Sequence, residues 1–312
     1  MPIRGAFGNG SMRTFGVDIG AKKVFGSNVA VQYLIVAGGG GSHGSYNPAS
    51  GTGSGGGGGA GGLRTGTTNT SAGARLFVAV GAGGTGYTNG TNSSVTVAND
   101  GIGGGVWSNL ICDGGGAGGY AYNSPGTTNF NALPGGSGGG GQGLYLNNSP
   151  GAAGYAPIGN NGGSGRGPAG VASASGGGGG AGGAGGPGVD APNNLIGGAG
   201  GAALASSITG TPVNYAGGGA GAGQAGGPAS GTQGTTAAPG GAVNSSAPAN
   251  GGGGAGGTVV GQDTVYSGGS GIVILRSATR ASNTIGSPTE TTVSGDYVYT
   301  FTGTGQIVFG TP

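Results

Sequence analysis

Residues 176–187 read Gly-Gly-Gly-Gly-Gly-Ala-Gly-Gly-Ala-Gly-Gly-Pro, so that a side chain stands at every third position, on Ala181, Ala184 and Pro187. A period of three fits neither the α-helix, with about 3.6 residues per turn, nor the two-residue pleat of a β-strand. It fits the extended left-handed polyproline II type of helix, which has about three residues per turn. The stretch therefore predicts an extended helix with one outward row of side chains.

The same spacing recurs along the chain, and 93 of the 312 residues are glycine. It is found at Ala60 and Leu63, at Ala117 and Tyr120, at Ala199 and Ala202, and at Ala222, Ala225 and Pro228. Extended helices of this type have no internal hydrogen bonds, so their N–H and C=O groups must bond to neighbours. We expect a bundle of polyglycine II helices, in which bare positions such as Gly182 and Gly183 face other helices.

A flexible, disordered polymer is the alternative reading of so much glycine, because ordering glycine costs more backbone entropy than ordering any other residue. Only 5% of the residues are charged and 34% are apolar, which argues against a solvated linker. Segments typical of β-strands also bracket the glycine-rich middle. An ordered bundle is therefore the favoured interpretation.

The strongest strand signal is Val29–Ala37, where β-branched and aromatic residues dominate and Gly38 follows. Six further segments have strand character: Arg75–Val80, Ser94–Ala98, Val106–Ile111, Gly271–Arg276, Tyr297–Thr302 and Gln306–Phe309. Tyr297-Val-Tyr-Thr-Phe301 alternates, which predicts one face on a core and one in solvent. No segment shows the apolar spacing of an α-helix. We expect an all-β protein with a β-sandwich scaffold and almost no α-helix.

The organisation predicted from these segments has two parts. Residues 1–28 carry more charge than the rest and are predicted to be an N-terminal attachment segment. Residues 29–312 are predicted to be one glycine-rich domain. Its β scaffold is expected from about 29–112 and 258–310, with the polyglycine bundle inserted at about 113–257.

Charge and composition exclude several classes of function. Nine Lys and Arg against seven Asp and Glu give a net charge of +2, too few cations to favour a nucleic-acid partner. No apolar run approaches the length of a transmembrane helix, so no membrane span is expected. The lone Cys112 cannot form a disulfide within the chain.

Neither an enzyme nor a cofactor or metal site is expected. Gly81-Ala-Gly-Gly-Thr-Gly86 matches the dinucleotide-binding spacing, but the sequence after it is typical of a turn and not of the helix that the motif requires. His43 is the only histidine, which leaves no paired metal ligand and no catalytic base for a serine. A solvated loop is its expected place.

Aromatic residues between the glycine tracts are the candidate recognition residues, because tyrosine supplies rigid amphipathic contact area. They are Tyr120, Tyr122, Phe130, Tyr145, Tyr155 and Tyr215. Two roles remain open for them: contact with a receptor, or packing over the bundle ends as caps.

Three segments together resemble the glycine-rich domain of bacteriophage tail and tail-fibre proteins. They are Tyr33-Leu-Ile-Val-Ala-Gly-Gly-Gly-Gly41 near the start, and Ser270-Gly-Ile-Val-Ile-Leu-Arg276 and Tyr297–Phe309 near the end. The likeness covers about residues 30–310. It is similar to two architectures: the polyglycine II sandwich of T-even-like tail-fibre adhesins, and the jelly-roll-like fold with inserted polyglycine helices of anaplastic-lymphoma-kinase-type receptors.

The resemblance implies a non-enzymatic virion protein of the tail or tail fibre, made in the host cytoplasm and acting outside it. Its expected partners are other virion proteins, bound through residues 1–28, a host cell-surface receptor, and further copies of itself as a homo-oligomer. The alternative is a self-assembling filament or decoration subunit without a ligand site. A third class, an ice-binding protein, would need a flat and regular face, which the irregular segments between the glycine tracts disfavour.

Overall fold

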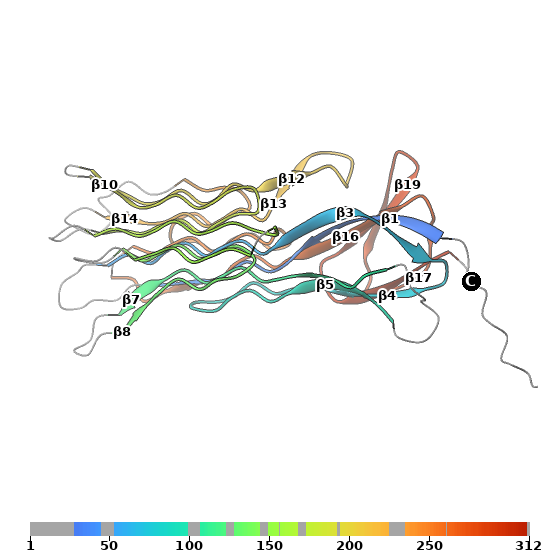
Figure 1. Cartoon of the computed structure of the whole chain (residues 1–312), viewed down its shortest axis with the longest axis horizontal. Helices are drawn as coiled ribbons and strands as arrows, with labels where there is room; N and C mark the ends of the chain where they lie inside the picture. The colour runs from blue at the N-terminus through green and yellow to red at the C-terminus, as the bar shows by residue number, and fades with distance from the viewer. Residues whose placement is uncertain are drawn as a thin grey trace, which may run out of the picture.

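A computed structural model describes residues 28–44, 53–98, 107–122, 128–143, 149–155, 157–167, 173–191, 194–224, 235–259 and 261–310. The molecule is elongated, with a β-sandwich at one end and long extended segments at the other (Figure 1). These residues form an all-β structure with no α-helix, as the sequence predicted. Accordingly, this part of the chain holds no helix of the length and apolarity that a membrane crossing requires.

The sandwich consists of two five-stranded antiparallel sheets. The first sheet contains, in spatial order, β18 (Thr289–Val293), β19 (Asp296–Phe301), β16 (Ile272–Ser277), β1 (Asn28–Val36) and β3 (Leu63–Ser71). The second sheet contains β17 (Ala281–Ile285), β20 (Gly305–Phe309), β4 (Arg75–Ala79), β5 (Ser93–Val97) and β6 (Leu110–Cys112).

All seven predicted strands are present in these two sheets, although β6 begins at Leu110 and Val106 lies outside the described residues. Within the sandwich, the sequence missed three strands: β3, β17 and β18. Each of them is an edge strand. Edge strands bury less surface and carry polar residues that discourage pairing with other chains. Their threonines and asparagines therefore gave no apolar signal.

The main apolar core lies between the two sheets. Its largest fully buried side chains include Tyr299, Phe301 and Phe309, and Tyr299 and Phe309 pack edge to face with ring centroids 5.8 Å apart. Trp107 is 8% exposed at the margin of this core. The aromatic residues of β19 and β20 thus fill much of the space between the two sheets.

A second apolar cluster lies on the other face of the first sheet. There Leu34, Ile274 and Val298 pack with Ile208 and Tyr215, which belong to the hairpin of β12 (Leu204–Ser206) and β13 (Val213–Tyr215). The expectation that one face of β19 would meet solvent is therefore wrong. Val298 on that face is fully buried in this cluster.

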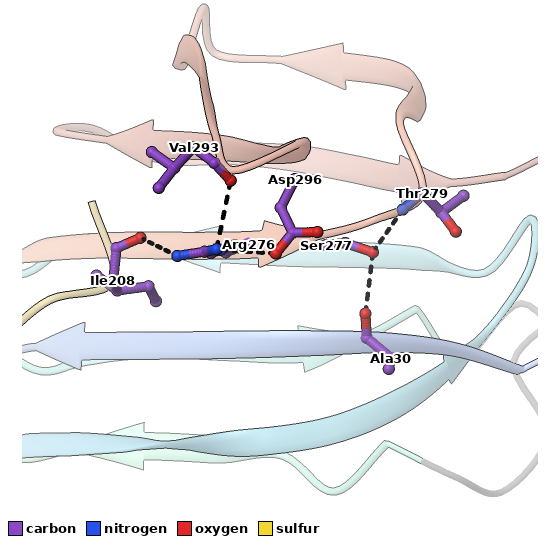
Figure 2. Close-up of polar contacts among 7 residues, drawn as sticks. All are labelled: Ala30, Ile208, Arg276, Ser277, Thr279, Val293 and Asp296. Atoms are coloured by element: carbon purple, nitrogen blue, oxygen red, sulfur yellow. Dashed lines mark hydrogen bonds and ion pairs between the residues drawn. The ribbon is translucent and has the colours of Figure 1, made fainter. Parts of the chain in front are cut away.

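Arg276 fastens this hairpin to the sheet (Figure 2). Its Nε donates to Asp296 Oδ2 at 2.8 Å, Nη2 donates to the carbonyl oxygen of Val293 at 3.3 Å, and Nη1 lies 3.5 Å from that of Ile208. On the next residue, the Ser277 hydroxyl donates to the carbonyl oxygen of Ala30 at 2.9 Å. Polar contacts of β16 thus reach β1, the adjoining ends of β18 and β19, and the loop of the hairpin.

Sandwich strands continue directly into the extended glycine segments. Residues 37–41 follow β1, residues 55–62 lead into β3, residues 113–119 follow β6, and residues 268–271 lead into β16. The hydrogen bonds also continue: Ala37 N–H donates to the carbonyl oxygen of Gly62 at 3.0 Å. No separate linker divides the two parts along these four segments.

Hydrogen bonds between the glycine segments repeat every three residues. In segment 55–62, the N–H groups of Gly56, Gly59 and Gly62 donate to one neighbour, residues 113–119. Those of Gly57 and Ala60 donate to residues 176–179. Those of residues 55, 58 and 61 donate to residues 252–258, so consecutive N–H groups point in three directions.

The carbonyl groups of segment 55–62 accept from three further neighbours: residues 137–140, residues 37–40 and Gly219. The segment thus has six hydrogen-bonded neighbours. A methyl group added to Gly58 would overlap the carbonyl oxygen of Gly40. Gly58 therefore has no room for a side chain, although some buried positions, such as Ala60 in the same segment, hold a methyl group. The bonding period is the one that polyglycine II helices require, and the helix type itself stays a prediction.

The glycine tract 176–187 does not run straight. Residues 181–183 form a bend, and Gly180 N–H donates to the carbonyl oxygen of Gly183 at 2.9 Å. The chain then returns antiparallel, with Gly177 N–H bonded to Gly186. The prediction that Gly183 lies tightly against a neighbour is wrong, because an added Cβ there would meet only Ala202, at the ordinary contact distances of 3.4 Å from its Cβ and 3.6 Å from its N. Glycine in this tract therefore forms a bend as well as extended backbone.

Short strand pairs occur where the glycine segments end. They are β2 (Ser42–His43) with β15 (Val265–Tyr266), β7 (Tyr120–Tyr122) with β8 (Thr128–Phe130), β9 (Ser173–Ala174) with β14 (Gly223–Gln224), and β10 (Val189–Ala191) with β11 (Asn194–Ile196). In Figure 1, β7, β8, β10 and β14 lie at the end opposite the sandwich. Asn28 and Phe309, near the first and last described residues, both lie in the sandwich. Of the predicted attachment segment 1–28, only Asn28 is described.

Candidate recognition surface

Four rings gather on the flank of the glycine bundle: His43, Tyr87, Tyr120 and Phe130, here called the aromatic cluster. Three of them come from the short strands β2, β7 and β8. Tyr120 and Phe130 are paired residues of β7 and β8, so their side chains share one face. The cluster therefore joins segments far apart in the sequence.

Tyr87 enters the cluster from a turn. The Thr85 N–H donates to the Thr88 hydroxyl at 2.8 Å, and that hydroxyl lies 2.8 Å from the carbonyl oxygen of Thr85. Gly86 has a φ of 60°, a left-handed conformation that favours glycine. This turn directs the Tyr87 ring onto β7 and β8.

The ring geometry is that of a stack with one ring across it. Tyr120 lies between His43 and Phe130, with centroid distances of 4.5 Å and 4.4 Å and interplanar angles of 23° and 4°. Tyr87 meets the edges of Tyr120 and Phe130 at 5.2 Å and 5.3 Å. Offset-stacked and edge-to-face pairs are the favoured arrangements of aromatic rings. The four rings consequently hold one another in place.

Polar groups fix two of the rings further. The Tyr87 hydroxyl donates to the carbonyl oxygen of Asn131 at 2.6 Å. Burial raises the pKa of Tyr87, and the neighbouring Tyr120 adds to this rise. His43 Nδ1 lies 2.9 Å from the carbonyl oxygen of Gly44. All four side chains are half-buried, which leaves part of each ring accessible from solvent.

The bundle itself explains why these rings lie on its surface. Many of its interior positions accept no side chain: an added Cβ at Gly40 or Gly118, beside the cluster in sequence, would overlap backbone atoms. Large side chains can therefore stand only where a segment ends or faces outward. The rings of the aromatic cluster accordingly lie at the surface of the bundle.

The candidate residues named from the sequence do not form one site. Tyr120 and Phe130 meet in the aromatic cluster. Tyr155 is 46% exposed, but it lies in a turn whose Ile158 carbonyl accepts from Leu63 N–H, next to the sandwich. Tyr215 is 5% exposed within the apolar cluster under the hairpin, so its side chain is not available at the surface.

Two candidates cannot be placed by their side chains. Tyr145 lies outside the described residues. Tyr122 is the last residue of β7, and only its backbone is described. Sequence reasoning missed the other half of the cluster: it assigned His43 to a solvated loop and treated Tyr87 as turn sequence. The signal that the sequence offered for these two rings was an aromatic residue at the end of β2, His43, and another directly after Gly86, Tyr87.

Cys112, the segment 81–90 and the acidic side chains are the groups that could indicate catalysis, cofactor binding or metal binding. Cys112 is fully buried, and burial raises the pKa of its thiol to about 12. The segment 81–90, which has the spacing of a dinucleotide-binding motif, forms extended backbone and a turn where that motif has a helix. Within the described ranges, no three His, Cys, Asp or Glu side chains gather as metal ligands would.

These observations define an all-β protein in which a glycine-rich bundle extends from a sandwich. A family model described as a glycine-rich domain matches residues 23–278. The chain therefore belongs to this glycine-rich domain family. Comparison with curated proteins and with solved structures finds no match.

Proposed function

We propose that this chain is a non-enzymatic virion protein of a bacteriophage tail or tail fibre that takes part in attachment to the host surface. The observation that carries the proposal is the half-exposed aromatic cluster, which lies on the bundle away from the sandwich. The proposed location is the virion tail. Residues 1–28 would bind other virion proteins, and several copies would assemble as a homo-oligomer.

The mechanism proposed is rigid display. Polyglycine II helices, bonded in six directions, would hold the cluster at a fixed distance from the sandwich. The rings are already ordered by their mutual stacking, so binding would cost little further side-chain entropy. Tyrosine and histidine offer both an apolar ring and a polar group, which suits a receptor surface of mixed character.

A chemical block tests this proposal without disturbing the stack. Asn131→Cys places a thiol on an exposed side chain beside the cluster, and Ala278→Cys places one on an exposed turn of the sandwich. The native Cys112 is buried and should not react. Assembled particles carrying either variant would be treated with a maleimide-linked polyethylene glycol, and adsorption to host cells would be measured.

We expect the block at position 131 to abolish adsorption and the block at position 278 to leave it unchanged. Equal adsorption of both labelled particles would contradict the proposal. Loss of adsorption only after labelling at position 278 would contradict it as well, because the receptor surface would then lie on the sandwich.

The self-assembling subunit remains the second candidate, and one observation favours it. Leu204 and Val213 on the β12–β13 hairpin are each 40% exposed, which leaves apolar area on the flank. Sedimentation of the wild type and of Leu204→Ser/Val213→Ser would test it. A filament or large oligomer that the double variant dissolves, together with unchanged adsorption of the particles labelled at 131, would replace the attachment proposal.

A further inference from the structure

The outer face of the second sheet differs from that of the first. The β12–β13 hairpin covers the first sheet, whereas Phe77 and Ile285 on the second sheet are 39% and 53% exposed. β4, β5 and β17 form the lower layer of the sandwich in Figure 1. This face carries two adjoining depressions of about 350 Å³ and 250 Å³, and both are lined by Ile285 and Gln306.

Cross-strand register arranges the side chains of this face in rows. Ile285 pairs with Gln306, Gln306 pairs with Phe77, and Phe77 pairs with Thr96. Paired residues point to the same side of a sheet. The half-buried amide of Gln306 therefore lies between two exposed apolar side chains, Ile285 and Phe77.

The next row, two residues along each strand, is more polar. Asn283 pairs with Val308, and Val308 pairs with Arg75. Arg75 is exposed and lines the larger depression together with Asn283. Both salt bridges of the described residues involve other arginines, so the Arg75 guanidinium faces this groove without a carboxylate partner.

We propose that this groove binds an acidic oligosaccharide, one that carries carboxylates on pyranose rings. The Phe77 ring offers an apolar surface to the C–H face of a sugar, and the amides of Gln306 and Asn283 can both donate to and accept from hydroxyls. Arg75 stands two residues from Phe77 on the same face, about 7 Å along the strand, within reach of a carboxylate on the stacked sugar or on its neighbour. A guanidinium binds a carboxylate through two parallel hydrogen bonds.

The lining favours this ligand over a second copy of the protein. An apolar protein partner would leave the Gln306 and Asn283 amides and the Arg75 charge desolvated, which is costly unless each finds a partner. A saccharide supplies hydroxyls and carboxylates for these groups. The inference does not depend on the phage assignment, because it concerns a different surface.

The test uses the full chain and short oligogalacturonates, with maltooligosaccharides of equal length as the neutral probe and sodium acetate as the simple anion. Binding would be followed by calorimetry and by backbone amide shifts of β4, β17 and β20. We expect the acidic oligomer to bind, to shift these strands and to weaken as salt is raised. The neutral oligomer should bind at least about tenfold more weakly, as expected from loss of the charged hydrogen bonds.

Two variants assign the contacts. Arg75→Gln should weaken the acidic oligomer at least about tenfold and bring its affinity close to that of the neutral one. Phe77→Ala should weaken both oligomers. Arg64→Gln, an exposed arginine on β3 of the other sheet, and Tyr155→Ala are the matched controls and should change neither.

Three outcomes would overturn the proposal. One is that neither oligomer shifts the second sheet. Another is that acetate alone reproduces the shifts, which would reduce the groove to a simple anion contact. The third is that Phe77→Ala changes only the sedimentation coefficient, which would make this face a contact between copies.

Discussion

At the residue scale, glycine acts in the bundle through the absence of a side chain. Gly58 shows this most clearly: its N–H donates to Ala255 and its carbonyl accepts from Gly219, while the position of its missing Cβ is occupied by backbone of Gly40 and approached by Ala255 N at 3.0 Å. Backbone atoms cannot swing away as a flexible side chain can. Interior glycines are therefore fixed by sterics and hydrogen bonding together.

A pair of glycine substitutions tests this reading. Gly58→Ala should lower the free energy of unfolding by about 3 kcal/mol or more, at the upper end of overpacking effects, because the surrounding backbone must shift. Gly183→Ala is the matched control: the added methyl meets only ordinary contacts, so stability should change by less than about 1 kcal/mol. Urea unfolding would measure both, and similar losses in the two variants would contradict the packing described for Gly58.

The buried thiol of Cys112 predicts a loss of stability at alkaline pH. Burial raises its pKa from 9.0 to about 12, aided by Asp113 and opposed by Arg64. The folded state therefore holds the proton more tightly than the unfolded state. Its contribution is fully present below pH 9 and is lost as the pH rises toward 12.

Urea unfolding at a series of pH values across this window would measure the effect. Several tyrosines also have raised pKa values, so the informative quantity is the difference between the wild type and Cys112→Ala. We expect this difference to shrink as the pH rises. A stability difference that stays constant across this pH range would mean that the Cys112 thiol has the same pKa in the folded and unfolded states.

Residue-level prediction from the sequence succeeded where the pattern was local. The apolar and aromatic run at Val29–Ala37 correctly indicated a strand, and Cys112 is free, as its being the lone cysteine required. The contact of His43 with Tyr120 could not be foreseen, because it depends on the register of segments separated by dozens of residues. The bend at 181–183 was also hidden, since glycine serves both an extended helix and a turn.

At the scale of elements, burial decided which strands the sequence revealed. β1 and β16 have apolar residues on both faces because the sandwich core lies on one side and the hairpin cluster on the other. They were predicted within one residue of their observed bounds. β3, with the sequence Leu-Arg-Thr-Gly-Thr-Thr-Asn-Thr-Ser, lies at an edge and reads as a loop.

The contact of hairpin and sheet makes a prediction for Arg276. This side chain is 16% exposed and bonds Asp296 and backbone carbonyls, so Arg276→Gln should cost about 1–2 kcal/mol of stability. Arg280→Gln is the matched control, because Arg280 bonds Glu290 at a similar 2.9 Å but is 66% exposed. It should cost less than about 0.5 kcal/mol. Equal losses in calorimetric unfolding would contradict a larger stabilising role for the Arg276 contacts than for the exposed Arg280 pair.

At the scale of the whole molecule, sandwich and bundle are connected by strands that pass from one into the other. Composition predicted both parts, and the family match supports the glycine-rich assignment. The sequence did not show that segments 37–41 and 55–62 lie among the later glycine segments. Identical glycine tracts carry no information about which tract is the neighbour of which, so this arrangement needed the structure.

In the bundle, consecutive amides of one glycine segment bond to three different neighbours. Scalar couplings across hydrogen bonds, recorded by NMR on deuterated, isotope-labelled protein, report donor and acceptor directly. Gly58 N–H should couple to the carbonyl carbon of Ala255, Gly59 N–H to that of Gly116, and Ala60 N–H to that of Gly179. Couplings that alternate between two neighbours, as in a β-sheet, or rapid solvent exchange without couplings at these three amides, would contradict the bundle.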